Sequence, residues 1–305
     1  MRLPLNGSRA GSSVPALPDR VTDALERATW LDEPADGVRR VTGALRAAPV
    51  ADVLSGRVAG HPLHPVLVTV PIGTLVGAAA LSFVRAPWAA PAARWLTGLG
   101  VLSVAPTAIT GWSDWNDTEG AERRVGLVHA GVNVLAVGAA TAAWAARSDT
   151  GRRTWLTATV GVLGVGGWLG GHLAYALGVG VDTTAFTALP DDWTDAGPLA
   201  TLTDGEPQGR DAGGLPVMLL RHAGRLTAVL DRCTHRGAPL HEGRLVDGCI
   251  ECPWHASLFA LDPAAGGRVE RGPATRPAPV LQVREHQGRV QVRADDVRAL
   301  RENPV

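Results

Sequence analysis

The sequence has few cysteines and no excess of either charge. Three of its 305 residues are cysteine, an odd number that leaves at least one without an internal disulfide partner. Basic and acidic residues number 29 each, so the basic excess that marks nucleic-acid binding is missing and we expect no nucleic-acid partner. The N-terminus also lacks a basic stretch followed by an apolar one, and we therefore expect no signal peptide.

Charged residues are absent from four long stretches, namely residues 61–84, 95–113, 125–146 and 154–181. Each is close to or above the roughly 20 residues that a membrane helix needs, and we predict four transmembrane helices there. The last stretch is rich in glycine at a small-xxx-small spacing, which permits close approach of helices in lipid. A buried soluble helical hairpin is the alternative, but it explains four consecutive uncharged stretches poorly.

The segment before the first predicted span, residues 1–54, is polar. Between Val21 and Val53 its apolar residues have a helix-compatible spacing, which Pro34 and Pro49 interrupt. Three interpretations stay open, namely an amphipathic helix on the membrane surface, a segment packed on another domain, and a solvated tail.

Beyond the fourth predicted span the pattern changes to short β-type runs bounded by glycine and proline. The stretches "PVMLLRHAGRLTAVLD" and "PVLQVREHQGRVQVR" each predict two strands joined by a three-residue loop, His-Ala-Gly in one and His-Gln-Gly in the other. His222 and His286 are then turn residues. We expect an all-β module at about residues 186–295, followed by a tail at 296–305.

Four soft-metal ligands lie between these two hairpins, in two short groups. Cys233 and His235 form the first, and Cys252 and His255 follow after sixteen intervening residues. A structural zinc site commonly pairs cysteine with cysteine and histidine with histidine, whereas each group here supplies one of each. This mixed order suits a binuclear centre in which two thiolates hold one iron and two imidazoles hold the other.

The two groups lie in sequences that resemble a known family. "CTHRGAPLHEG" followed by "CPWHASLF" resembles the two cluster-binding loops of the Rieske [2Fe-2S] family over their whole length. The resemblance implies one [2Fe-2S] cluster, with Cys233, His235, Cys252 and His255 as its ligands, on an antiparallel β scaffold. His241 lies outside the ligand positions, and we expect it at the surface.

Departures from the family pattern indicate which branch the chain resembles. The extra cysteines of high-potential members would fall at Ala238 and Trp254, so the chain resembles the ferredoxin-like branch of cytosolic carriers and oxygenase systems. Ser257 occupies the position from which high-potential members direct a hydroxyl at a bridging sulfide, whereas Phe259 occupies the position at which they carry tyrosine. Ala256 occupies a position at which many members of the family have glycine. We predict a reduction potential in the lower or middle part of the range of about −150 to +300 mV.

The sequence after the module is short, about ten residues beyond the last expected strand. We therefore expect no oxygenase domain with a 2-His-1-carboxylate iron site.

Ionisable residues gather toward one face of the four predicted spans, on the side where the β module emerges. They are His61, His64, Asp114, His129 and His172. Ionisable groups in membrane helices are costly and usually mark a site. Three interpretations stay open: interface residues that meet lipid headgroups, a haem b held between histidines of different helices, or a quinol or proton site.

The membrane half carries a resemblance of its own. "GRVAGHPLHPVLVTVPIG", "TGWSDW", "RRVGLVHAGVN" and "GGHLAYALGVGV" resemble an uncharacterised bacterial membrane-domain family that is often fused to a Rieske module. The resemblance covers about residues 55–182. The expected fold class is therefore α + β multidomain, a four-helix transmembrane bundle followed by an all-β Rieske iron–sulfur domain.

We expect a multi-pass protein of the bacterial cell membrane, in contact with the lipid bilayer. Arginines flank both ends of the spans, so the positive-inside rule does not decide the orientation. The missing export signal and the missing protective disulfide favour a cytoplasmic Rieske domain.

The predicted function is that of a membrane-anchored electron carrier, which passes single electrons between redox proteins or to a membrane site and makes or breaks no substrate bond. One alternative is an enzyme, a quinol- or haem-using oxidoreductase with the Rieske domain as its relay. A second alternative is a redox sensor.

Overall fold

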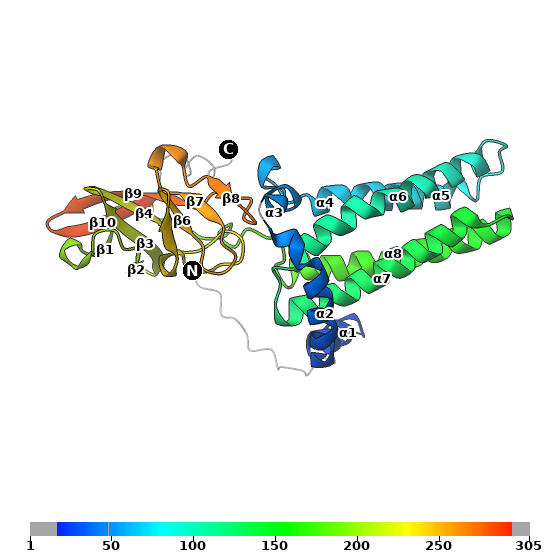
Figure 1. Cartoon of the computed structure of the whole chain (residues 1–305), viewed down its shortest axis with the longest axis horizontal. Helices are drawn as coiled ribbons and strands as arrows, with labels where there is room; N and C mark the ends of the chain where they lie inside the picture. The colour runs from blue at the N-terminus through cyan, green and yellow to red at the C-terminus, as the bar shows by residue number, and fades with distance from the viewer. Residues whose placement is uncertain (1–16, 48, 295–305) are drawn as a thin grey trace, which may run out of the picture.

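The computed structural model describes residues 17–47 and 49–294 and divides into two parts along its long axis (Figure 1). The helical region comes first, with helices α1 (Leu17–Glu26), α2 (Asp32–Thr42), α3 (Val50–Leu54), α4 (His64–Leu67), α5 (Thr69–Leu81), α6 (Ala89–Trp115), α7 (Gly120–Ala145) and α8 (Asp149–Tyr175). The β domain follows, with strands β1 (Thr194–Pro198), β2 (Gln208–Ala212), β3 (Leu215–His222), β4 (Arg225–Leu230), β5 (Arg244–Val246), β6 (Cys249–Glu251), β7 (Leu258–Ala260), β8 (Val269–Arg271), β9 (Val280–His286) and β10 (Arg289–Ala294). The predicted order of a helical part and an all-β part is confirmed. The predicted tail at 296–305 lies outside the described residues.

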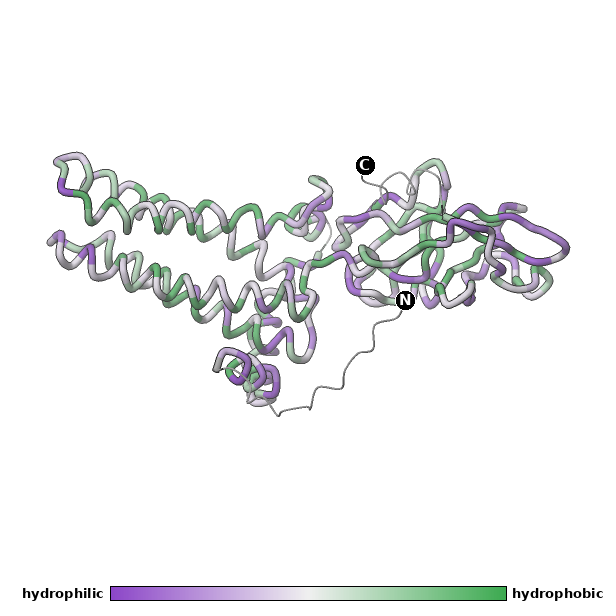
Figure 2. The backbone as a smooth tube through the Cα atoms, turned by 180° about the vertical axis from the view of Figure 1, so that it is seen from behind, coloured by the Kyte–Doolittle hydropathy of each residue, from purple (hydrophilic) through white to green (hydrophobic). Residues whose placement is uncertain are grey.

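The long helices form two neighbouring pairs, α5 with α6 and α7 with α8 (Figure 1). Small buried residues such as Ala78 and Ala143 lie between the pairs, with Leu156. Large apolar side chains are exposed instead, and Figure 2 shows that hydrophobic and neutral residues predominate along the long helices. Three stretches of the described chain are long and apolar enough to cross a membrane, His64–Leu81, Gly120–Ala145 and Asp149–Tyr175.

The second predicted span, which lies within α6, is not among these three stretches. Its hydropathy is reduced by hydroxyl residues, but four of these hydroxyls, on Thr97, Ser103, Thr107 and Thr110, donate to carbonyls within the helix. Thr97 donates to the carbonyl of Ala93 at 2.7 Å, and Thr107 donates to that of Ser103 at 2.9 Å. A hydroxyl bonded one turn back exposes little polarity to its surroundings.

The N-terminal helices α1 and α2 pack on α7. Arg124 of α7 binds both carboxylate oxygens of Asp32 at 2.7 Å and also donates to the carbonyl of Glu26 at 2.7 Å. Pro34, at which the sequence pattern predicts an interruption of the helix, lies in the first turn of α2. A proline is tolerated there because no intrahelical partner for its N–H is needed.

The β domain consists of two antiparallel sheets. Six strands follow the order β1-β10-β9-β4-β3-β2, and four follow the order β5-β6-β7-β8. Both predicted hairpins are present, but their loops have two residues rather than the three predicted. His222 pairs with Arg225 and His286 pairs with Arg289 as the last strand positions, and positive φ angles at Ala223 and Gly224 close the first turn. Two-residue turns of this kind match the twist of the paired strands, so strand pairing continues up to the histidines and leaves only two residues in each loop.

A hydrophobic core lies between the two sheets. Met218 and Val229 from the larger sheet meet Ile250 and Phe259 from the smaller one, and Cys233 and Cys252 belong to the same buried cluster. The two cysteines among the predicted ligands are therefore part of a packed core.

Candidate metal centre

Two tight loops carry the predicted ligands. The first, residues 233–238, follows β4, and the second, residues 252–257, connects β6 and β7. In the first, the amide of Cys233 donates to the carbonyl of Ala238 at 2.8 Å; in the second, the amide of Cys252 donates to that of Ser257 at 2.8 Å. Each loop thus closes on itself in the same way and directs its cysteine and its histidine toward the other loop.

The two thiols face each other in the core. Cys233 is 1% exposed and Cys252 is 2% exposed. A hydrogen bond between the two side chains raises the pKa of Cys233 and lowers that of Cys252 to about 7. Backbone amides of His255 and Trp254 also lower the pKa of Cys252. Amides aimed at sulfur stabilise thiolate, which is the form that binds iron.

The two imidazoles form a second pair, with ring centroids 5.0 Å apart and planes at 84°. The Nδ1 atoms of His235 and His255 are both buried and have no hydrogen-bond partner in the described structure. Burial lowers the pKa of His235 to about 3 and that of His255 to about 4, so both rings are neutral at pH 7. A neutral imidazole with an unsatisfied nitrogen is suited to a metal, and leaving that nitrogen without a partner is costly.

The donors come as one thiol pair and one imidazole pair. Within residues 17–47 and 49–294, no three His, Cys, Asp or Glu side chains gather around a single ion position. A [2Fe-2S] cluster of the Rieske type takes two thiolates on one iron and two imidazoles on the other. The residues present therefore fit this cofactor.

The neighbours of the loops are packed or paired. Ser257 is fully buried, and its Oγ accepts a hydrogen bond from the amide of Ala274 at 3.0 Å. Phe259 is fully buried in the core behind the loops. Ala256 has φ +59°, the left-handed region in which glycine is favoured. His241, which we expected at the surface, is half-buried, with Nδ1 2.5 Å from Oδ2 of Asp231.

The connection from α8 reaches the first loop directly. The amide of Thr183 donates to the carbonyl of Thr234 at 3.2 Å, and its hydroxyl donates to the carbonyl of Cys233 at 2.8 Å. The link between the two parts of the chain is thus fastened to the backbone of a predicted ligand.

The helical region also covers the loops. Oδ2 of Asp117, in the connection from α6 to α7, lies 3.8 Å from Nε2 of His235, and Arg236 forms an ion pair with Glu122 of α7. Oδ1 of Asp52 in α3 accepts a hydrogen bond from the amide of Gly272 at 2.6 Å. Burial raises the pKa of Asp117 to about 6, although nearby arginines oppose this. No sequence motif marks these contacts.

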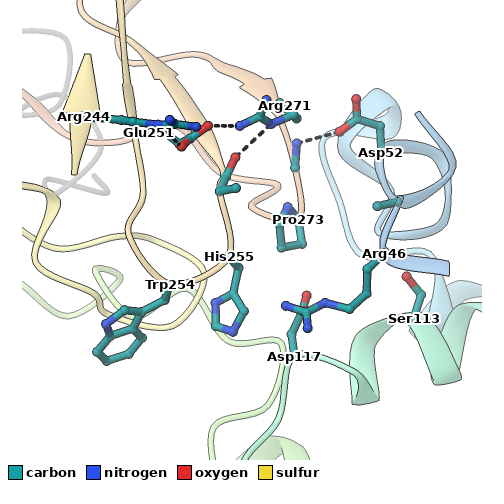
Figure 3. Close-up of a pocket in the computed structure, with 13 residues that line it drawn as sticks. Arg46, Asp52, Ser113, Asp117, Arg244, Glu251, Trp254, His255, Arg271 and Pro273 are labelled. Atoms are coloured by element: carbon teal, nitrogen blue, oxygen red, sulfur yellow. Dashed lines mark hydrogen bonds and ion pairs between the residues drawn. The ribbon is translucent and has the colours of Figure 1, made fainter. Parts of the chain in front are cut away.

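A cavity of about 460 Å³ opens where the two parts meet (Figure 3). His255 points into it between Trp254 and Arg46, and Asp117 lies beside Arg46. Trp254 is 55% exposed, so one flank of the imidazole pair can be reached from solvent. Arg271 and Arg244, both bound to Glu251, form another wall.

The predicted membrane residues have different surroundings. His61 and Asp114 line a second cavity of about 280 Å³, together with His235. Nδ1 of His64 is 3.0 Å from the carbonyl oxygen of Thr107, Nδ1 of His129 is 2.9 Å from that of Gly166, and Nε2 of His172 is 2.9 Å from Oε1 of Glu26. A haem or quinone site among them stays a prediction.

Family models match both halves of the chain. A Rieske [2Fe-2S] domain matches residues 192–287, and a predicted membrane protein family (DUF2231) matches residues 60–183.

Similar proteins match in the β domain. The anthranilate 1,2-dioxygenase ferredoxin subunit of Burkholderia cepacia is 36% identical over 101 residues, which are 33% of this chain and 91% of that protein. Ferredoxin CarAc of Metapseudomonas resinovorans is 35% identical over 80 residues, 26% of this chain and 72% of its own length. Human apoptosis-inducing factor 3 is 32% identical over 93 residues, but the chain spans only 15% of that protein.

Among solved structures, the ferredoxin of carbazole 1,9a-dioxygenase from Nocardioides aromaticivorans IC177 is 24% identical, with a TM-score of 0.31; the match covers 34% of this chain and all of that one. The Rieske domain implies one [2Fe-2S] cluster and electron transfer, and the domain is homologous to ferredoxin subunits of dioxygenase systems. The chain belongs to the Rieske [2Fe-2S] family, with a DUF2231 membrane-protein domain ahead of its Rieske domain.

Proposed function

We propose that this protein is a membrane-anchored Rieske electron carrier. Cys233 and Cys252 would bind one iron, and His235 and His255 would bind the other. The observation that carries the proposal is the pair of buried Nδ1 atoms without partners, next to two buried thiols that face each other. The bound cluster supplies one-electron transfer. The chain's own residues hold it at the end of a rigid core and keep water from its sulfur side.

The membrane arrangement that we propose has four spans, about 61–84, 95–113, 125–146 and 154–181, between the polar segment 1–54 and the Rieske domain at 186–295. Three apolar stretches support it. For the remaining span, α6 is 27 residues long, as α8 is. Trp95 and Leu102 of α6 are 81% and 75% exposed, which suits lipid and not water. We place the Rieske domain in the cytoplasm, because an unprotected cluster suits a reducing compartment.

The partner that we propose is a soluble redox protein. The similar protein from Burkholderia cepacia is named as the ferredoxin subunit of anthranilate 1,2-dioxygenase. In this chain the helical region covers His235, whereas Trp254 beside His255 stays exposed. Exposed aromatic residues are common at protein interfaces. The open flank at Trp254 is therefore the face that we assign to the soluble partner.

The ligand assignment is tested by replacing His255 with Ala in the full-length protein in detergent. We expect loss of the paramagnetic signal of the reduced cluster together with loss of bound iron. Cys249→Ser is the matched control, because Cys249 lies three residues before Cys252 and outside both loops, and it should keep both. A normal signal in the His255 variant would exclude our ligand set.

A second candidate function has one observation in its favour. His61 and Asp114 share a cavity with His235, so a quinol- or haem-using oxidoreductase would place its membrane site beside the cluster. An oxidised-minus-reduced optical spectrum of the full-length protein tests this. A sharp haem band absent from the isolated Rieske domain would favour the enzyme, and identical spectra would remove the haem alternative.

A further inference from the structure

Asp117 is a buried carboxylate that lies between the two parts of the chain. It follows the last residue of α6 by two positions, and its side chain is 9% exposed. Its Oδ1 lies 3.3 Å from Nε of Arg46, and its Oδ2 lies 3.8 Å from Nε2 of His235. A carboxylate is rarely buried without compensating charge; Arg46 is the nearest compensating charge, and Arg39 and Arg236 add to it. The other oxygen is directed at a predicted cluster ligand.

The proton of the His235 ring determines which group faces Oδ2 of Asp117. Its Nδ1 is the buried nitrogen that has no partner and would bind iron. In a neutral imidazole that ligates through Nδ1, the proton resides on Nε2. The N–H of His235 is therefore on the nitrogen that faces Asp117. At 3.8 Å the contact is longer than a hydrogen bond and acts through charge.

The two imidazoles differ in their surroundings. His235 faces the carboxylate of Asp117, whereas His255 points into the cavity next to the guanidinium of Arg46 (Figure 3), whose charge acts on both rings. A negative charge near an iron stabilises its oxidised form, and a positive charge stabilises its reduced form. Both charged side chains belong to the helical region, whereas all four predicted ligands belong to the Rieske domain.

We propose that Asp117 is a positioning residue through which the helical region sets the electron affinity of the cluster. It does so by placing a negative charge at Nε2 of His235 and by neutralising Arg46. The inference rests on the proposed ligand set. It gives the DUF2231 domain a part in the redox chemistry of this chain beyond that of an anchor. Removing the carboxylate takes away one negative charge and leaves Arg46 uncompensated, and both changes favour the reduced cluster.

The test is a potentiometric titration of the full-length protein in detergent at one fixed pH, followed through the signal of the reduced cluster. For Asp117→Asn we expect about a tenfold rise in the ratio of reduced to oxidised cluster at a given ambient potential. For a one-electron couple, this corresponds to a rise of about 59 mV in the reduction potential of the cluster. Arg46→Gln should move the potential downward. Asp117→Glu, which keeps the charge, should stay near the parent protein.

Glu119→Gln is the comparison variant, because it removes the same charge from the same connection. The charge of Glu119 also acts on His255, but its side chain is 66% exposed, so water screens this effect. A purely structural role would loosen the junction in both Asp117→Asn and Arg46→Gln and move both potentials in the same direction. That outcome, or a shift in Asp117→Asn no larger than in Glu119→Gln, would overturn the proposal. If Asp117→Asn fails to hold a cluster, an upward shift in Arg46→Gln alone would overturn it.

These outcomes are separate from a failure of the proposed function. A cluster that survives the loss of His255 would overturn the ligand set, whatever the charge variants do. A cluster that depends on His255 but keeps its potential in all charge variants would overturn this inference alone.

Discussion

The contact between Asp52 and Gly272 allows a quantitative prediction about the junction between the two parts. The carboxylate of Asp52, 13% exposed, accepts the amide of Gly272 at 2.6 Å and lies 3.2 Å from Nε of Arg57. A hydrogen bond to a charged group contributes about 1.5–3 kcal/mol, and a partly exposed ion pair adds at most about 1 kcal/mol. Asp52→Ala should therefore destabilise the junction by about 2 kcal/mol, which raises the population of the open junction about thirtyfold.

Hydrogen–deuterium exchange of a peptide that covers residues 268–276 measures this change in the full-length protein. Exchange at Gly272 should become at least tenfold faster in Asp52→Ala and change less in Asp52→Asn, which keeps an acceptor oxygen. Asp192→Ala is the control, because this exposed aspartate lies in the β domain away from α3. Unchanged exchange in Asp52→Ala would show that the junction does not depend on this contact.

Three further predictions concern the metal centre itself. Ala256→Gly should raise the free energy of unfolding of the Rieske domain by about 1 kcal/mol, since glycine adopts the φ of +59° at this position without the cost of a Cβ; a lower thermal midpoint for loss of the cluster spectrum would contradict this. Phe259→Ala should cost about 3–5 kcal/mol, because the ring is fully buried, and it should reduce the iron retained after mild heating; retention equal to that of the parent would show that the core tolerates the cavity. Anaerobic removal of iron by a chelator, without denaturation, should let a maleimide label Cys233 and Cys252, which the iron-loaded protein protects, whereas Cys249 should react in both forms; equal labelling of Cys233 and Cys252 with and without iron would mean that they do not serve as iron ligands.

Local patterns in the sequence predicted much of this molecule. The alternation of apolar and polar residues, with two turn signals, predicted the β3–β4 and β9–β10 hairpins. The absence of charge predicted the long helices with errors of up to six residues at their ends. The cysteine and histidine groups predicted which side chains would gather at the candidate metal centre, and the two thiols and the two imidazoles do lie together. That they bind a cluster stays a prediction. These features depend on contacts between near neighbours in the chain or on composition.

Contacts between distant residues were not predictable in this way. Asp117 meets His235 and Glu122 meets Arg236 across more than a hundred residues, and neither acidic residue carries a local signal that separates it from an ordinary charge at a helix end. His241 shows the same limit at short range, because its partner Asp231 is ten residues away and buried. The hairpin loops were predicted one residue too long, since strand pairing extends to the histidines themselves.

The connection through Thr183 restricts how the Rieske domain can move. Its two hydrogen bonds to Cys233 and Thr234 attach the tether at the cluster end of the domain, not at the far end of the sheet. A domain held at that end can pivot, but the pivot lies beside the iron, so the cluster travels least of all its parts. Electron delivery by a long swing of the cluster is thereby disfavoured. In the proposed membrane arrangement, a soluble partner would come to the cluster at the bilayer surface, where its search would be confined to two dimensions once it touches the membrane.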